Sequence, residues 1–89
     1  MNREVMTVGM VVKSAAGRDS GSWYVIVRVE DGFAYIADGK THKLDKPKKK
    51  NPLHLRKTLT VLDLTDITDK KLRLALMSFG LRANTEESD

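Results

Sequence analysis

The stretch VGMVVKSAAGRDSGSWYVIVRVEDGFAYIADG, residues 8–39, decides the fold of this chain. It contains three runs rich in β-branched and aromatic residues, at 8–13, 23–29 and 33–37. Such runs favour β-strands, because these side chains fit a pleated and half-buried surface. The first connection, residues 14–22, carries two glycines, and the second is the dipeptide Asp31-Gly32, a strong hairpin signal. The pattern therefore predicts a three-stranded antiparallel meander.

The middle run, residues 23–29, carries apolar side chains on both of its faces. A small sheet of this kind needs a second layer, or closure into a barrel, to bury both faces. The rest of the chain offers one more strand, at 58–62, and one helix, at 68–79. We therefore expect a mostly β fold, a small and partly open SH3-like barrel with one C-terminal α-helix.

Alternation along the middle run separates its side chains into two sets. Arg28 marks the set that it shares with Tyr24 and Ile26 as the solvent-facing one, since a charged group avoids the core. The opposite set is the expected core, and it consists of Val25, Val27 and Val29.

A helical repeat of apolar residues marks the C-terminal element. Thr68 or Asp66 can cap its start, and Gly80 suits the position just past its end. The side chains expected on the barrel recur at helical spacing, and they are Leu72, Ala75, Leu76 and Phe79. A second apolar line belongs either to the core, which is the simpler expectation, or to a partner contact; it comprises Leu74, Met77 and Leu81. Residues 1–83 then form a single domain, and 84–89 form a flexible acidic tail.

Positive charge is concentrated in one segment. The chain has a formal net charge of +4. Residues 40–57 hold eight Lys or Arg and one acidic residue, so this basic loop carries +7 and the remainder of the chain carries −3. A local field of this size attracts a polyanion, whereas scattered lysines serve mainly for solubility.

Two prolines, Pro47 and Pro52, bracket residues 48–51 within the basic loop and keep that arm extended. An extended chain points successive side chains to alternate sides, so its three lysines cannot all face one surface. We expect a short strand at 42–44 before the arm, and Leu53 and Leu55 clamping its far end onto the core. The arm is either a solvated charge run or a phosphate-binding segment that orders only with nucleic acid.

The sequence offers little for catalysis or metal binding. It has no cysteine and no phosphate-cradling GxxxxGK[ST] loop, and its two histidines, His42 and His54, lie among lysines. We expect no enzyme activity, no cofactor, no metal and no small-molecule substrate. No apolar run approaches the roughly 18 residues of a membrane span, and the N-terminus lacks a signal-peptide pattern. The expected location is the cytoplasm, with no membrane partner.

A family resemblance joins the meander to the basic loop. Its residues are Gly9, Val11, Val12, Ser14, Gly17, Gly21, the run 24–27, Val29 and Asp38-Gly39, followed by PKKKNPLHL at 47–55. This pattern resembles the KOW motif of RNA-binding proteins, above all the KOW-containing large-subunit ribosomal proteins and their small bacterial relatives. The resemblance implies RNA as the partner, ribosomal RNA first, with ribosomal proteins beside it. It implies work in translation, either as a stable ribosomal protein or as a peripheral or assembly-stage RNA binder.

The resemblance also assigns positions to the RNA. The family's RNA-facing positions match the glycine loop, residues 14–19, and the arm around 46–51. Tyr24 and Tyr35 are added as base-stacking candidates, because we expect them on the outer face of their strands and expect Trp23 and Phe33 in the core. The full set of candidate RNA-binding residues is Ser14, Gly17, Arg18, Tyr24, Tyr35, Lys43, Lys46, Lys48, Lys49, Lys50, Asn51, His54, Arg56 and Lys57. The alternative function is an SH3-like protein–protein interaction domain that uses exposed aromatics or the C-terminal helix.

Overall fold

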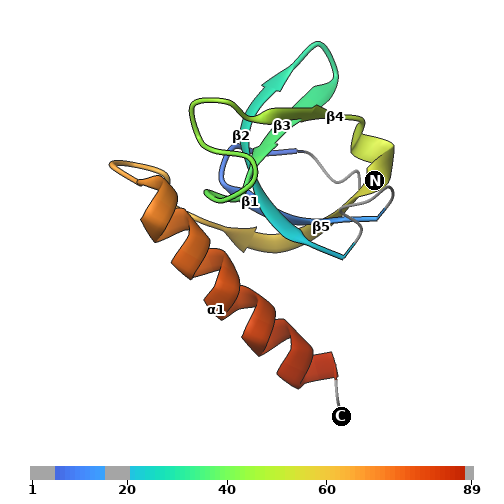
Figure 1. Ribbon diagram of the computed structural model, residues 1–89. Helices are drawn as coiled ribbons and strands as arrows, with labels where there is room; N and C mark the ends of the chain where they lie inside the picture. The colour runs from blue at the N-terminus through green and yellow to red at the C-terminus, as the bar shows by residue number, and fades with distance from the viewer. Residues whose placement is uncertain (1–5, 16–20, 88–89) are drawn as a thin grey trace.

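The computed structural model describes residues 6–15 and 21–87 of the chain, with side chains described up to Arg82. Within these residues the elements are β1 (Met10–Ser14), β2 (Trp23–Glu30), β3 (Phe33–Ala37), β4 (Lys48–Lys50), the 3₁₀ turn η1 (Pro52–His54), β5 (Leu55–Val61) and α1 (Asp69–Glu87). The strands form one antiparallel sheet in the order β4-β3-β2-β1-β5 (Figure 1). The predicted mostly β domain with one C-terminal helix is confirmed. The sheet is not closed into a barrel, because β4 and β5 are its two edges.

The predicted meander is present as β1, β2 and β3, with β2 paired to both neighbours. The hairpin between β2 and β3 turns at Asp31 and Gly32, whose φ angles are 52° and 80°. Positive φ at both positions is typical of the primed turn whose twist matches that of the flanking strands. The last strand, β5, pairs with β1 and begins three residues before the predicted start at 58.

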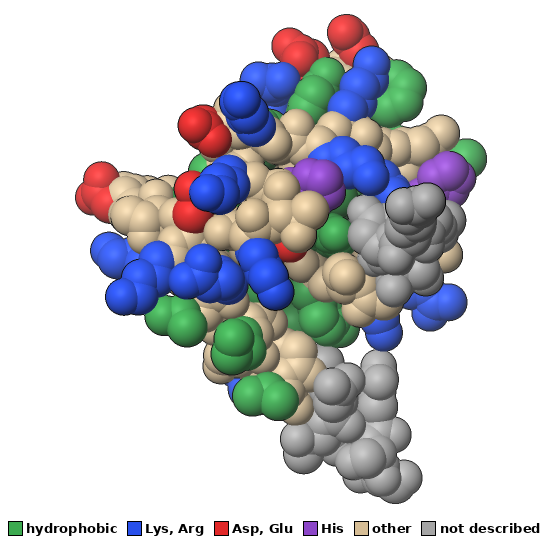
Figure 2. All heavy atoms as spheres, in the orientation of Figure 1, with side chains coloured by type: hydrophobic (Ala, Val, Ile, Leu, Met, Phe, Trp, Pro, Cys, Tyr) green, Lys and Arg blue, Asp and Glu red, His purple; other side chains and the backbone are tan. Residues whose placement is uncertain are grey.

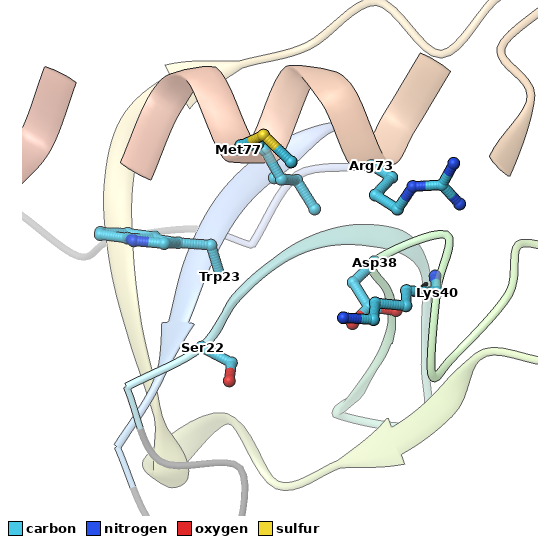
Figure 3. Close-up of a pocket in the computed structure, with 7 residues that line it drawn as sticks. Ser22, Trp23, Asp38, Lys40, Arg73 and Met77 are labelled. Carbon is cyan, nitrogen blue, oxygen red and sulfur yellow. Dashed lines mark hydrogen bonds between the residues drawn. The ribbon is translucent and has the colours of Figure 1, made fainter. Parts of the chain in front are cut away.

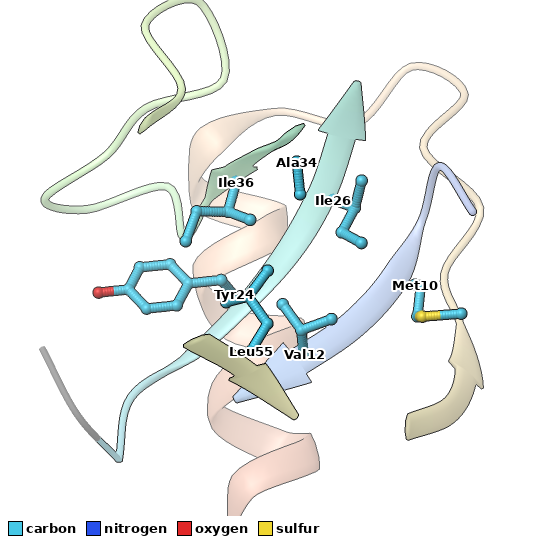
Figure 4. Packing of buried hydrophobic residues seen from close by; sticks show 7 residues of the cluster. All are labelled: Met10, Val12, Tyr24, Ile26, Ala34, Ile36 and Leu55. Atoms are coloured by element: carbon cyan, nitrogen blue, oxygen red, sulfur yellow. The ribbon is translucent and has the colours of Figure 1, made fainter. Parts of the chain in front are cut away.

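Both faces of the sheet carry buried apolar side chains. The face away from α1 holds one cluster, which consists of Met10, Val12, Tyr24, Ile26, Ala34, Ile36 and Leu55 (Figure 4). On the other face Val11, Val25 and Ala37 pack against Leu72 and Leu76 of the helix. The first half of β2 is therefore buried on both sides, as the sequence predicts for the middle strand.

The predicted division of β2 into a core set and a solvent set is wrong at three positions. Tyr24 and Ile26, predicted to face solvent, are 2% and 0% exposed, and Val29, predicted in the core, is 39% exposed. The register of β2 against β3 shifts between Ile26 and Arg28. Such a bulge places an extra residue in one strand and changes the face that the following residues occupy. Alternation in the sequence does not reveal it.

The helix α1 begins where the sequence predicts. The Thr68 hydroxyl accepts a hydrogen bond from the Lys71 amide at 3.2 Å, and the Thr68 carbonyl accepts one from the Leu72 amide at 2.8 Å. The first bond satisfies an amide of the first turn, which has no carbonyl partner within the helix, and the second is the first backbone bond of the helix itself. In the preceding turn the Thr65 amide donates to the Asp63 carboxylate at 2.9 Å, and this bond lowers the pKa of Asp63 below its ordinary value.

The predicted end of the helix at Phe79, just before Gly80, is wrong. The helical backbone continues to Glu87, through part of the segment predicted as a flexible tail, and residues 88–89 lie outside the described part of the chain. Gly80 instead admits a neighbour, since a Cβ there would lie 3.1 Å from Cδ1 of Trp23. The helix crosses one side of the sheet, and its C-terminal half projects beyond it (Figure 1).

The predicted stripe of α1 does pack on the sheet: Leu72 and Leu76 are buried, and Ala75 and Phe79 are half-buried. Other apolar side chains expected in the core lie on the surface. The second helix line is 51%, 57% and 64% exposed at Leu74, Met77 and Leu81, so the expectation of a core role is wrong. Of the two leucines expected to clamp the basic arm, Leu55 is buried but Leu53, in η1, is exposed.

The strand predicted at 42–44 is a turn instead. The Asp38 carboxylate accepts hydrogen bonds from the Lys40 and His42 amides, both at 2.9 Å. The Leu44 amide donates to the Asp69 carboxylate at 2.8 Å, which ties this loop to the first turn of α1. Asp38 and Asp69 compete with a strand ladder for these amides, because carboxylates bond readily to nearby backbone. The fourth strand is β4.

Candidate nucleic-acid interface

The pairing of β1 with β5 brings together two segments that the sequence predicts to bind RNA. Lys13 lies opposite Arg56 in the ladder. Just past β1, the Ala15 amide donates to the His54 carbonyl at 2.8 Å. The start of the glycine loop and the end of the basic loop, about 40 residues apart in sequence, are therefore neighbours.

The base of the glycine loop is closed by backbone hydrogen bonds. The Gly21 amide donates to the Ser14 carbonyl at 2.7 Å, and the Ser14 amide donates to the Ser22 carbonyl at 2.9 Å. The predicted site residues Gly17 and Arg18 fall outside the described residues. The N-terminal flank of their loop lies beside β5, where Ser14 is opposite Leu55.

A row of three side chains crosses β2, β1 and β5 next to this loop, and we call Trp23, Lys13 and Arg56 the Lys13 row. Trp23 pairs with Lys13, and Lys13 pairs with Arg56, so the three share one face of the sheet. The Lys13 ammonium lies 5.3 Å from the centroid of the Trp23 ring. A polar pocket of about 310 Å³ opens at the row; its lining residues are Lys13, Ser14, Ala15, Gly21 and Arg56.

Trp23 is held firmly in this row by the helix. Its ring packs edge-on against Phe79 at a centroid distance of 4.9 Å and an interplanar angle of 78°. Gly80 allows the indole to approach the backbone of α1, because a Cβ at that position would lie only 3.1 Å from the indole. The expectation that Trp23 belongs to the core is confirmed in part. Its side chain is half-buried and packs against the cluster that Leu72 and Leu76 of α1 form with the sheet.

A second row crosses β2, β3 and β4, and we call Arg28, Tyr35 and Lys49 the Tyr35 row. The register pairs Arg28 with Tyr35 and Tyr35 with Lys49. The Arg28 guanidinium lies 4.2 Å from the centroid of the Tyr35 ring, and the Lys49 ammonium lies 4.4 Å from that of Phe33. Glu30 forms an ion pair with Arg28 at 3.5 Å. The row lies on the face that α1 covers elsewhere, since Tyr35 is two residues from Ala37, which packs under the helix.

The strands divide the basic loop, so the positive charge that the sequence concentrates in one segment reaches both edges of the sheet. Lys48–Lys50 form one edge strand and Arg56 belongs to the other. Within β4, Lys49 shares a face with Tyr35, whereas Lys48 and Lys50 share the opposite face with Ile36 and Ala34, their buried partners. The predicted alternation of the arm is thus confirmed. Figure 2 shows Lys and Arg side chains distributed over the visible face in several groups.

Several other predicted site residues occupy positions that the sequence does not foresee. Tyr24 is buried, with its ring 5.9 Å from that of His42, so the predicted outward position for base stacking is wrong. Ser14 is 1% exposed in the wall of the polar pocket. The Asn51 side chain caps η1 by accepting a hydrogen bond from the Leu53 amide at 2.9 Å. The remaining candidates are exposed or half-buried: Lys43, Lys46, His54 and Lys57.

A second pocket, of about 260 Å³, lies between the start of β2, the 38–40 loop and α1 (Figure 3). Its lining residues are Ser22, Trp23, Asp38, Lys40, Arg73, Leu76 and Met77. The sequence predicts no site role for Lys13, Lys40 or Arg73. Alternation in the first strand could have placed Lys13 beside the loop, but no local signal brings Lys40 and Arg73 to Trp23.

The described residues contain no group of three or more His, Cys, Asp or Glu side chains arranged to hold a metal ion. No helix among them combines the length and apolar character that a membrane crossing needs. Neither the protein-family models nor the curated proteins give a match to this chain.

Proposed function

We propose that this protein is a non-enzymatic RNA-binding module, a small KOW domain of SH3-like form left open between β4 and β5. It binds structured RNA, ribosomal RNA first, and works in the cytoplasm beside the ribosome. The observation that carries the proposal is the convergence of the Lys13 row with the base of the glycine loop across the β1–β5 ladder. The glycine loop, which matches RNA-facing positions of the family, thereby shares one surface with the end of the basic loop.

The physical basis is attraction to phosphate at a polar surface. Lys13 and Arg56 place two cations at a polar pocket that is also lined by Ser14, Ala15 and Gly21 at the base of the loop. Cations that displace counterions from RNA contribute binding affinity that does not depend on sequence. Helical RNA is recognised largely through its shape, its phosphates and its 2′-hydroxyls, which suits a polar pocket better than an apolar one. The choice of RNA over DNA rests on the KOW resemblance.

The Tyr35 row contributes less to the binding of RNA phosphates. Glu30 compensates part of its positive charge through the ion pair with Arg28. Both cations of the row lie close to aromatic rings, at 4.2 Å and 4.4 Å. These contacts stabilise the edge of the sheet and leave the row with a smaller net field toward RNA.

A salt titration tests the proposal. A fluorescein-labelled RNA hairpin, and a fragment of ribosomal RNA, are titrated with the full chain by anisotropy between 50 and 300 mM KCl. If four to six cations meet phosphate, the logarithm of the affinity falls against the logarithm of salt with a slope on the order of −3 to −5. Lys13→Gln with Arg56→Gln reduces that slope in magnitude by roughly 2.

The matched control is Arg28→Gln with Lys49→Gln, which removes two cations from the same sheet face. It changes the slope by less than about 1, because the ion pair with Glu30 already lowers the field of that row. A wild-type slope near zero overturns the proposal. If the two double variants change the slope equally, the Lys13 row is not the main RNA-binding surface.

A second candidate function is protein binding through α1, and the exposed line of Leu74, Met77 and Leu81 favours it. Contiguous exposed apolar side chains on a small protein mark contact surfaces. In that case Leu74→Asp abolishes capture of the partner and leaves RNA affinity within twofold of wild type. Binding that Leu74→Asp leaves intact, in low and high salt, speaks against this candidate.

A further inference from the structure

The pocket between β2 and α1 combines an apolar wall with charged groups at its far side. Trp23, Leu76 and Met77 supply the apolar wall, and Figure 3 shows Trp23 and Ser22 on one side with Asp38, Lys40 and Arg73 on the other. The Lys40 and Arg73 side chains are both exposed, so a ligand can reach them. Aromatic and cationic walls together suit a flat ring that carries a phosphate.

The size of the pocket limits its occupant. Its volume of about 260 Å³ lies below the roughly 300–1,000 Å³ of typical small-molecule sites. It therefore fits one ring-sized group better than a whole cofactor. Lys40 and Arg73 outweigh the single carboxylate of Asp38, which already accepts two backbone hydrogen bonds, from the Lys40 and His42 amides.

Trp23 connects this pocket to the surface described above. The same ring lines the pocket, lies 5.3 Å from the Lys13 ammonium and belongs to the Lys13 row. Ser22, which lines the pocket, also holds the glycine loop, because its carbonyl accepts the Ser14 amide at 2.9 Å. An RNA backbone held at Lys13 and Arg56 therefore passes within reach of the pocket.

We infer that the pocket receives one unpaired nucleotide of the bound RNA, with its base against Trp23 and Met77 and its phosphate at Lys40 and Arg73. This inference rests on the proposed RNA-binding function and extends it. The preferred RNA is then a helix interrupted by an unpaired nucleotide. Fully paired RNA leaves the pocket empty and is held by phosphate contacts outside it, those of the Lys13 row among them. Stacking tolerates any base, because each base has a π-face.

The test uses two RNA hairpins that are identical except for one bulged adenosine. Trp23 is the single tryptophan of the chain, so its fluorescence reports on the pocket without labelling. We expect both hairpins to bind. The bulged hairpin binds about tenfold more tightly, the usual size of one stacked base, and it alone quenches the tryptophan.

Two charge reversals on α1 complete the design. Arg73→Glu changes a pocket residue, and Lys71→Glu makes the same change in charge at an exposed residue that does not line the pocket. Both weaken RNA binding in general through the loss of positive charge. Only Arg73→Glu removes the preference for the bulged hairpin and its quenching. Circular dichroism confirms that both variants are folded.

The outcomes separate the two proposals. If both hairpins bind with the same affinity and change the tryptophan fluorescence to the same extent, the pocket has no role and the RNA-binding function stands. If the bulge is preferred but Arg73→Glu keeps the preference, the nucleotide is read elsewhere and the inference is overturned. If neither hairpin binds at 50 mM KCl, the proposed function fails and the inference fails with it.

Discussion

The Lys13 row and the Tyr35 row contain the same kinds of side chain in different settings. Each joins one aromatic ring to two cations across three strands of the sheet. In the Lys13 row the ring packs against α1, through Phe79, and the cations border a polar pocket. In the Tyr35 row a cation lies 4.2 Å from the ring and is paired with Glu30.

The difference shows that composition alone does not define a binding surface. Cations that interact with rings and carboxylates of their own strands stabilise the sheet, whereas cations beside a loop and a pocket remain available to a ligand. The neighbouring elements, α1 and the glycine loop, distinguish the two rows. The following substitutions test this distinction.

The aromatic rings give the largest expected contrast in stability. Trp23→Ala removes the contact with Phe79 and opens a cavity beside α1, so the free energy of unfolding falls by about 3–4 kcal/mol. Tyr35→Ala removes a ring from the open part of the sheet and costs about 1–2 kcal/mol. Urea unfolding measures both. Equal losses would mean that the helix does not distinguish the two rows.

Two glycine turns, one docked on α1 and one beside the Tyr35 row, differ in how closely they approach other elements. Gly39 has φ of 78°, and a Cβ there would overlap the Asp69 carbonyl oxygen at the start of α1. Gly39→Ala therefore costs roughly 3 kcal/mol, through backbone strain and displacement of the helix. Gly32, beside the Tyr35 row, has φ of 80°, and a Cβ there meets no described atom within 4 Å. Gly32→Ala costs only about 1 kcal/mol. Similar unfolding midpoints would contradict the close docking of the 38–40 loop on α1.

The cations give the smallest and most selective contrast. The substitution that costs more stability is expected to cost less RNA affinity. Arg28→Ala lowers the free energy of unfolding by about 0.5–1 kcal/mol, through loss of Tyr35 and Glu30 as partners. Lys13→Ala costs about 0.5 kcal/mol or less, since its ammonium is 5.3 Å from the Trp23 centroid. In RNA titrations at low salt Lys13→Ala weakens binding more than Arg28→Ala does. If Arg28→Ala weakens RNA binding more than Lys13→Ala does, the Tyr35 row is the main RNA contact and the Lys13 row is not.

Local sequence signals predicted several elements of this fold correctly. The dipeptide Asp31-Gly32 forms the hairpin turn, because positive φ at both positions is a property of those residues themselves. Thr68 caps α1, because its hydroxyl reaches an amide three residues ahead. Gly80 failed as a stop signal. Its role is to admit Trp23, a residue 57 positions earlier, and a helical pattern holds no information about that contact.

The candidate site was predictable only in pieces. The sequence marks the glycine loop and the basic loop as separate segments, and it predicts that successive lysines of the arm face opposite sides. It does not contain the bulge between Ile26 and Arg28, after which Val29 is exposed, and it does not show that the face of Tyr24 is covered by a buried cluster. It also gives no reason to connect Lys40 and Arg73 with Trp23.

The sequence by itself determined the meander, the start of the helix and the excess of positive charge after residue 39, because each depends on residues close together in the chain. Only the tertiary structure decided where that charge lies. The order β4-β3-β2-β1-β5 sends one part of the basic loop to each edge of the sheet. The β1–β5 ladder then sets Arg56 beside Lys13 and the glycine loop. Strand pairing between distant segments controls this placement, because burial of both sheet faces selects the register and no short segment can specify it.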